Sequence, residues 1–146
     1  MKVAIVQNRP DFGNVQDNLN RIEEMLDGKA ADLFVLPELF ATGYRFKNME
    51  EAHRFAEPVS GGTTTHFLIS LAKKNKAHFI AGLVEIEGDQ VYNSSVIVGP
   101  KGLIGRYRKI HLFDTEKSCF HAGTDVPPVF DLDGVKVGVM ICFDWR

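Results

Sequence analysis

Three residues of this chain combine reactive side chains with a shared local context. Glu38, Lys109 and Cys142 each come directly after, or within two residues of, a short run of mainly apolar residues. In α/β sheets, catalytic and ligand-binding groups lie beyond the carboxyl ends of strands. A carboxylate, an ammonium and a thiol in such positions predict a hydrolytic site whose nucleophile is the thiol.

Cys142 is the predicted nucleophile. A single Cys is more often an inert, buried thiol that behaves as a small apolar residue. The position of Cys142 after the run 135–141 favours the catalytic interpretation, because a strand end would present the sulfur at the edge of a sheet. The backbone N–H of Phe143 would then lie beside the sulfur and could bind an oxyanion. Cys119 is an alternative thiol, but it lies in a loop and ranks well below Cys142.

Glu38 is the predicted general base. The alternative is a surface carboxylate that caps the following turn. The apolar run 33–36 in front of it indicates a half-buried setting instead. Burial raises the pKa of a carboxyl group and suits it to exchange a proton near neutral pH.

Lys109 lies in a basic stretch whose alternative interpretations are a solvated strand end or a nucleic-acid contact. If this strand alternates, Tyr107 and Lys109 share one face, and Arg106 and Arg108 take the other. Only the face of Lys109 would then look into the site. His111 follows on the side of Lys109, where a packed or hydrogen-bonded imidazole is a better interpretation than a catalytic one.

The composition is that of an ordinary globular domain. The chain has 146 residues, 45% hydrophobic and 25% charged, enough for one domain with its own core. A net charge of −2 argues against nucleic-acid or anionic-membrane partners, and no apolar run has the length of a membrane span. Two cysteines without a CxxC pattern favour a reducing, cytoplasmic setting. The five histidines lack metal-ligand spacing, and no phosphate-binding glycine motif is present, so no metal or cofactor is expected.

The pattern of elements alternates at first and then becomes a series of strands. Helices are expected over 14–27, over 48–55 and from a cap within 60–65 to Lys76. Strands are expected over 2–7, 33–36, 78–84, 90–98, 102–107, 129–132 and 135–141. A loop is expected over 114–128. Strands that alternate with helices and are followed by hairpins predict the α/β class, with a mixed sheet covered by helices on at least one face.

Three segments in this order resemble the nitrilase, or carbon–nitrogen hydrolase, superfamily. They are Leu36–Tyr44, Tyr107–Phe113 and Gly138–Arg146, and Asn93–Ser95 is similar to a strand motif of the same family. The resemblance runs from residue 2 to the last residue. The stretch Phe113–Lys117 looks most like microbial nitrilases and ω-amidase-like members.

The resemblance implies a catalytic set of Glu38, Lys109 and Cys142, with Glu116 as an assisting second carboxylate. It implies hydrolysis of a small amide or nitrile to a carboxylic acid and ammonia, through a Cys thioester and without a metal or organic cofactor. It also implies an α-β-β-α sandwich that is commonly a homodimer. Tyr44, Phe113 and Phe143 are the candidate substrate-binding residues, with Trp145 as a further possible pocket wall.

Members of that family continue well beyond the nucleophile. We therefore expect residues 1–146 to be a carbon–nitrogen hydrolase domain truncated at its carboxyl end, comparable to the N-terminal half of the sandwich. Apolar surface on strands 2–7 and 135–141 should then lie open. Two other functions stay open: a non-catalytic fragment or half-subunit that binds a partner chain, and a thiol redox sensor that uses Cys142 or Cys119.

Overall fold

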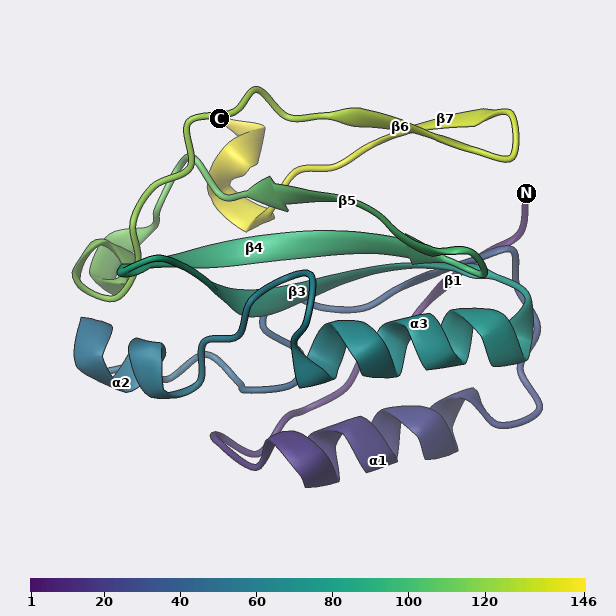
Figure 1. Cartoon of the computed structure of the whole chain (residues 1–146), viewed down its shortest axis with the longest axis horizontal. Helices are drawn as coiled ribbons and strands as arrows, with labels where there is room; N and C mark the ends of the chain where they lie inside the picture. Colours follow the sequence, from purple (N-terminus) through teal and green to yellow (C-terminus); the bar gives the residue numbers. More distant parts are fainter.

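The structure is a computed structural model that describes residues 1–146. Its main feature is a five-stranded mixed sheet with the strand order β1-β2-β3-β4-β5 (Figure 1). The first three strands run parallel, and β3, β4 and β5 form an antiparallel meander. The strands are β1 (Val3–Ile5), β2 (Leu33–Val35), β3 (His78–Glu87), β4 (Gln90–Gly99) and β5 (Gly102–Arg108). The predicted α/β class and mixed sheet are confirmed.

Helices cover one face of this sheet. The two longer ones, α1 (Val15–Leu26) and α3 (Thr63–Asn75), lie on the same side of the sheet, and the short α2 (Met49–Arg54) lies near its end (Figure 1). The apolar residues of α1 recur at helical spacing, so Leu19, Ile22 and Leu26 all face the sheet and are buried. They pack with side chains of β2, β3 and α3 in the largest core cluster.

A hairpin covers the other face. It consists of β6 (Val129–Leu132) and β7 (Val135–Gly138), which pair with each other and not with the main sheet (Figure 1). Leu132 packs into a second core cluster with Ile80, Ile97 and Tyr107 of the sheet. The molecule therefore has a helix layer, a sheet layer and a hairpin layer.

The last strand is shorter than the predicted 135–141. It ends at Gly138, and its final contact is the Val139 N–H donating to the Pro128 carbonyl at 3.1 Å. Pro127 and Pro128 have no N–H to donate, so the ladder cannot continue past this point. Residues 139–141 run on without strand pairing, and Cys142–Trp145 form a short 3-10 helix, η2.

The predicted loop 114–128 also contains structure. Its first part, Asp114–Ser118, is a 3-10 helix, η1, stabilised by the Glu116 side chain, which accepts from the Phe113 N–H at 2.7 Å. A carboxylate at this position satisfies a free N–H at the start of the turn. The same side chain is part of the site described below.

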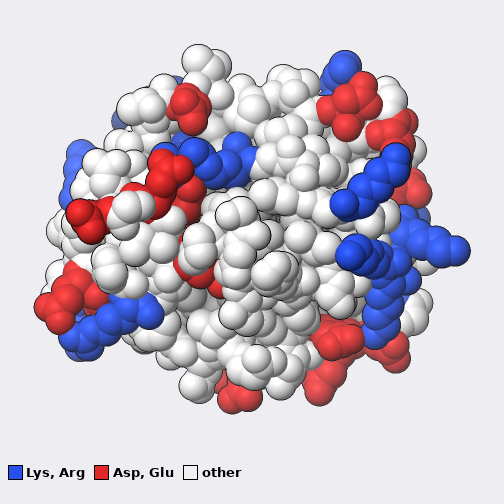
Figure 2. Space-filling model, in the orientation of Figure 1, with Lys and Arg blue, Asp and Glu red and all other residues white.

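Several large apolar side chains are exposed outside these cores. Four of them lie on β1 and on the hairpin, namely Val3, Ile5, Val129 and Val135. This agrees with the open apolar surface expected on the first and last strands. Figure 2 shows Lys and Arg next to Asp and Glu mainly toward the edge of the viewed face, whose middle consists mostly of other residues. No helix has the length and apolar character needed to cross a bilayer.

Candidate active site

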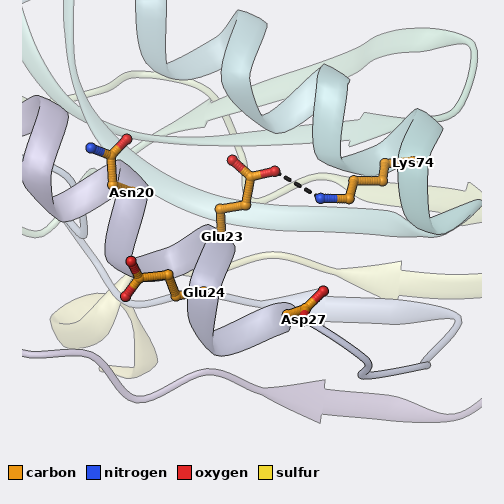
Figure 3. A pocket seen from close by; sticks show the side chains of 5 residues that line it. All are labelled: Asn20, Glu23, Glu24, Asp27 and Lys74. Atoms are coloured by element: carbon orange, nitrogen blue, oxygen red, sulfur yellow. Dashed lines mark hydrogen bonds and ion pairs between the residues drawn. The ribbon is translucent and has the colours of Figure 1, made fainter.

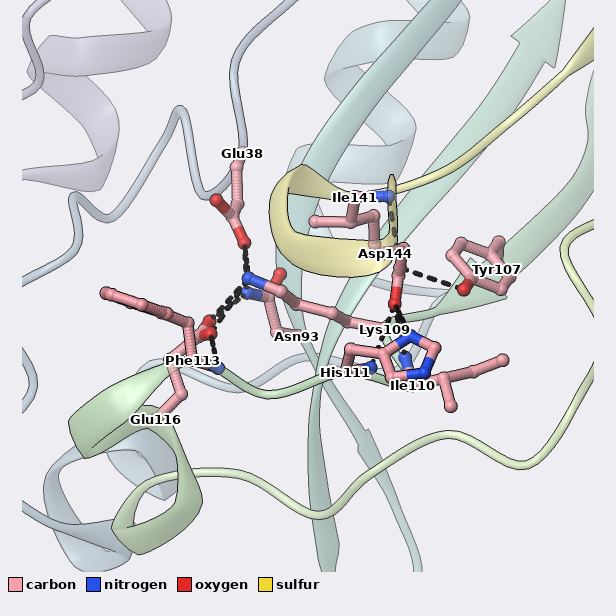
Figure 4. A network of polar contacts seen from close by, with 10 residues as sticks. All are labelled: Glu38, Asn93, Tyr107, Lys109, Ile110, His111, Phe113, Glu116, Ile141 and Asp144. Atoms are coloured by element: carbon pink, nitrogen blue, oxygen red, sulfur yellow. Dashed lines mark hydrogen bonds and ion pairs between the residues drawn. The ribbon is translucent and has the colours of Figure 1, made fainter. Parts of the chain in front are cut away.

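The centre of the site is the ammonium of Lys109, which follows β5 and whose side chain is completely buried. Its Nζ donates to Glu38 Oε1 at 2.7 Å, and to Glu116 at 2.8 Å (Oε2) and 3.0 Å (Oε1) (Figure 4). One buried cation thus bridges two carboxylates. The structure brings Glu38, which lies 71 residues before Lys109 in the chain, together with Lys109 and Glu116.

An amide side chain joins the same cluster. Asn93 of β4 is fully buried and donates from Nδ2 to Glu38 Oε1 at 2.6 Å and to Glu116 Oε1 at 2.8 Å (Figure 4). The Lys109 N–H donates to the Asn93 carbonyl at 2.9 Å, which fixes the two residues side by side. Sequence reasoning noted Asn93 only as part of a family-like strand. The signal that could have identified it is the polar run Asn93–Ser95 inside a strand whose other half is apolar.

The charges of this cluster stabilise one another. Burial alone would lower the pKa of Lys109, but hydrogen bonds to Glu116 and Glu38 and their charges raise it above its usual value. Burial alone would raise the pKa of Glu116, but hydrogen bonds from Lys109, Tyr44, the Phe113 N–H and Asn93 lower it. Lys109 and Glu116 are therefore an ammonium and a carboxylate at neutral pH.

Glu38 lies close against strand β3 because residue 82 has no side chain. A Cβ on Gly82 would lie 2.6 Å from Glu38 Cα and from Leu39 N, closer than real Cβ atoms approach. The backbone is pinned there by the Gly82 N–H, which donates to the Pro37 carbonyl at 3.2 Å, and by the Phe40 N–H, which donates to the Gly82 carbonyl at 3.3 Å. Gly82 therefore sets the position from which the Glu38 side chain reaches Lys109.

Cys142 is exposed and begins the turn η2 with a left-handed backbone (φ 44°). Together with Glu38, Ser95 and Met140 it lines a largely apolar pocket of about 110 Å³. Burial of the sulfur and the charge of Glu38 raise the pKa of the Cys142 thiol, while Lys109 opposes the shift. The thiol therefore needs a base to remove its proton at neutral pH.

None of the predicted substrate-binding residues Tyr44, Phe113 and Phe143 is among the residues that line the pocket of Cys142. Tyr44 is partly exposed, and burial together with a hydrogen bond to Glu116 raises the pKa of its phenol. The rings of Phe113 and Phe143 pack with centroids 5.0 Å apart, and the Phe113 ring is exposed. Trp145 is also exposed. Their contact with a substrate stays a prediction.

Other chemically interesting residues lie outside this site. Cys119 is buried, and its thiol donates to the Phe46 carbonyl at 3.5 Å. His111 is hydrogen-bonded, with Nδ1 3.1 Å from Asp144 Oδ1, as the sequence suggested. Arg106 and Arg108 lie on the face of β5 opposite to Lys109, where both pair with Glu85, so the predicted alternation is confirmed. No three His, Cys, Asp or Glu side chains are arranged to hold a metal ion.

A larger hollow than the pocket of Cys142 contains none of the predicted catalytic residues. It measures about 480 Å³ and lies at the surface of α1 and α3 (Figure 3). Its lining is polar, and Lys74 Nζ donates to Glu23 Oε1 at 2.8 Å across it. The lining residues are Asn20, Glu23, Glu24, Asp27 and Lys74. This hollow has no nucleophile, and its size alone does not make it an active site.

Comparison with known proteins places this site in a family context. The model of the carbon-nitrogen hydrolase family matches residues 2–146. The chain is 47% identical over 148 residues to a nitrilase of Pyrococcus abyssi. It is 34% identical over 150 residues to the 2-oxoglutaramate amidase of Bacillus subtilis. Each alignment covers 99% of this chain and 56% of the relative.

The solved structures agree with this comparison. Nit3 of Saccharomyces cerevisiae, a member of the nitrilase superfamily, matches with a TM-score of 0.83 and 30% identity, over 99% of this chain and 56% of that one. The chain thus spans about half the length of the relatives it matches. The family match over nearly every residue and the shared fold lead to one conclusion: the chain belongs to the carbon–nitrogen hydrolase family.

Proposed function

We propose that this chain carries the catalytic residues of a hydrolase that cleaves non-peptide carbon–nitrogen bonds in small amides or nitriles. The observation that carries the proposal is the single cluster in which Lys109 bridges Glu38 and Glu116, while Glu38 and Cys142 line one pocket. This set contains a base, a cation and a nucleophile, which we propose act together on one small ligand. Substrates named for relatives, such as 2-oxoglutaramate, indicate the class of molecule to test.

The first half of the proposed reaction makes a thioester. Glu38 accepts the thiol proton of Cys142, and the sulfur attacks the amide carbon, so that a C–S bond forms and the carbonyl oxygen becomes an oxyanion. Lys109 and the Phe143 N–H stabilise that charge, at about 3–4 kcal/mol per donor. Glu38 returns the proton to the nitrogen, the C–N bond breaks, and ammonia leaves.

The second half regenerates the thiol. Glu38 accepts a proton from water, the resulting hydroxide adds to the thioester carbon, and the C–S bond breaks to release the carboxylic acid. The proton on Glu38 passes to the departing sulfur of Cys142. For a nitrile, the first adduct is a thioimidate, and a further water adds before ammonia leaves. This chemistry requires a free thiol, so we propose a reducing cytoplasm as its setting.

Glu116 has a supporting role in this proposal. It holds the ammonium of Lys109 from the side opposite to Glu38, with Asn93 donating to both carboxylates. The ammonium is then fixed in place before substrate arrives, and little reorganisation is needed when the oxyanion forms. Tyr44, Phe113 and Phe143 are the proposed walls of the substrate pocket.

The test is release of ammonia from a panel of small amides and nitriles. Cys142→Ala and Glu38→Gln should each abolish turnover, because one removes the nucleophile and the other the base. Glu23→Gln is the matched control: Glu23 carries a carboxylate in a surface ion pair on α1, and its loss should leave turnover unchanged. Turnover that survives in Cys142→Ala would exclude the proposed mechanism.

A second proposed function rests on the exposed apolar residues Val3, Ile5, Val129 and Val135. We propose that this surface binds a polypeptide equivalent to the part of the relatives that this chain does not span. Exposed apolar residues that form a contiguous surface commonly mark an interface. Co-expression with such a polypeptide, followed by light scattering on the purified product, should give a stable complex, and Ile5→Asp should weaken it. A chain that stays monomeric in that mixture would contradict the second function.

A further inference from the structure

The turn that carries Cys142 has few hydrogen bonds to the rest of the molecule. Strand β7 ends at Gly138, so residues 140–146 take no part in any sheet. Every hydrogen bond that joins these residues to an earlier part of the chain ends on one side chain, the carboxylate of Asp144. The remaining attachment is apolar packing, through Ile141 in the second core cluster and through the Phe143 ring against Phe113.

Asp144 is buried, and both of its oxygens are fully used. Oδ2 accepts from the Tyr107 hydroxyl at 2.8 Å and from the Ile141 N–H at 3.1 Å. Oδ1 accepts from the N–H groups of His111 at 2.8 Å and Ile110 at 3.2 Å, and lies 3.1 Å from His111 Nδ1 (Figure 4). Five contacts therefore meet on one carboxylate.

The donors to Asp144 that lie outside the turn belong to the segment that carries Lys109. Tyr107 precedes Lys109 by two residues, and Ile110 and His111 follow it directly. The Ile141 N–H, in contrast, belongs to the turn of Cys142 itself, and the Asp144 N–H closes that turn by donating to the Ile141 carbonyl at 3.1 Å. Asp144 thus binds the Tyr107 side chain before Lys109, the backbone just after Lys109 and the backbone just before Cys142.

We infer that Asp144 is a positioning residue that holds the Cys142 turn in register with the Lys109 segment, and so sets the distance from the sulfur to Lys109 and Glu38. Its effect on turnover rests on the proposed function, whereas its effect on the thiol does not. The left-handed backbone of Cys142 makes such a restraint necessary, because a non-glycine residue in that conformation persists only where its surroundings hold it.

An ionised carboxylate suits this role better than an amide. It accepts at both oxygens, whereas an Asn side chain has one accepting oxygen and one donating nitrogen. Burial alone would raise the pKa of Asp144, but the hydrogen bonds from His111, Tyr107 and Ile141 lower it below its usual range. The charge is therefore kept, and Asp144→Asn would turn one accepting arm into a donor facing other donors.

The experiment measures how much the charge of Glu38 changes the pKa of the Cys142 thiol. The rate of alkylation by iodoacetamide is followed against pH on the intact chain, with peptide mapping to separate Cys142 from Cys119. In the parent, Glu38→Gln should lower the thiol pKa, because the charge of Glu38 helps to raise it. In the Asp144→Asn background the thiol pKa should already lie closer to the usual value, and Glu38→Gln should no longer shift it.

Two controls keep the result interpretable. Asp131→Asn changes an exposed Asp that also binds a backbone N–H, and it should leave the Cys142 titration unaltered. If Asp144→Asn does not fold, Tyr107→Phe removes the 2.8 Å contact from the sheet side and should weaken the response to Glu38→Gln in the same direction. The inference would be overturned if Asp144→Asn folds and Glu38→Gln still shifts the thiol pKa as much as in the parent. If Tyr107→Phe takes its place, an equally large shift in that variant would overturn it.

Turnover provides a separate readout. If the parent hydrolyses small amides, Asp144→Asn should lower kcat by on the order of 100-fold, with a smaller change in KM, because misplacement of a nucleophile by about 1 Å has that effect. A parent with no turnover at all would contradict the proposed function. The thiol titration would still decide the role of Asp144.

Discussion

Lys109 and Glu38, 71 residues apart in the chain, form an ion pair with 2.7 Å between Nζ and Oε1. The Lys109 side chain has no contact with solvent, so its charge depends on Glu38 and Glu116 for compensation. This dependence makes the pair a structural element of the fold as well as part of the proposed mechanism.

Removal of the ammonium should therefore destabilise the chain. Lys109→Met leaves two carboxylates close together and without their cation, and loss of one partner from a buried ion pair costs about 3–5 kcal/mol. Urea unfolding followed by circular dichroism measures the change. Lys136→Met, which breaks an exposed pair with Asp131, is the matched control and should have no measurable effect. Equal midpoints for the two variants would contradict the structural role of Lys109.

The two cysteines should differ sharply in reactivity. Cys142 is exposed and Cys119 is buried, so iodoacetamide should modify Cys142 first. Because the pKa of the Cys142 thiol is raised, its alkylation rate should reach half-maximum above the usual thiol value of about 8.5. Mass spectrometry at a series of pH values measures both effects. A half-maximum near neutral pH would show that Lys109 dominates the electrostatics of the sulfur.

Protonation of the Glu116 carboxylate should lower the stability of the folded chain in acid. The pKa of Glu116 is lowered in the folded state, so the unfolded state binds the proton more readily. The resulting stabilisation is complete above the unfolded pKa, about 4.3 for Glu, and is lost as the pH falls through the lower folded value. Glu116→Gln should flatten the fall of the unfolding free energy below that pH. Urea titrations in acidic buffers measure it, and an unchanged slope would argue against the assignment.

The close approach at Gly82 gives a steric prediction. Gly82→Ala places a Cβ against the backbone of Glu38, and overpacking of this kind costs about 1–3 kcal/mol. The displaced Glu38 should also lower any turnover. Gly61→Ala is the control, because a Cβ there meets nothing within 4 Å. Thermal unfolding compares the two, and a Gly82→Ala chain as stable as Gly61→Ala would show that this contact can relax.

Local sequence patterns indicated the main residues of the site. Glu38, Lys109 and Cys142 each follow an apolar run, and alternation along β5 correctly placed Lys109 opposite to Arg108. These signals are local and so can be read without knowing the fold. The family resemblance added Glu116, which the structure places 2.8 Å from Lys109.

The supporting groups were not predictable in the same way. The partners of Asn93 and Asp144 come close only through tertiary pairing, so a local pattern can mark these residues as polar but cannot say what they bind. The early end of β7 likewise depends on which residues of the opposite strand can donate, and Pro127 and Pro128 cannot. A local sequence pattern can identify a reactive side chain. The residues that hold this side chain in place are identified only from the folded structure.

The left-handed backbone of Cys142 sets the proposed chemistry of its thiol against the stability of the fold. Glycine adopts this conformation freely, whereas other residues carry a penalty on the order of 1 kcal/mol. A Cys142→Gly chain should therefore be inert yet more resistant to heat than the parent. At this position, selection for thermostability alone would discard the sulfur.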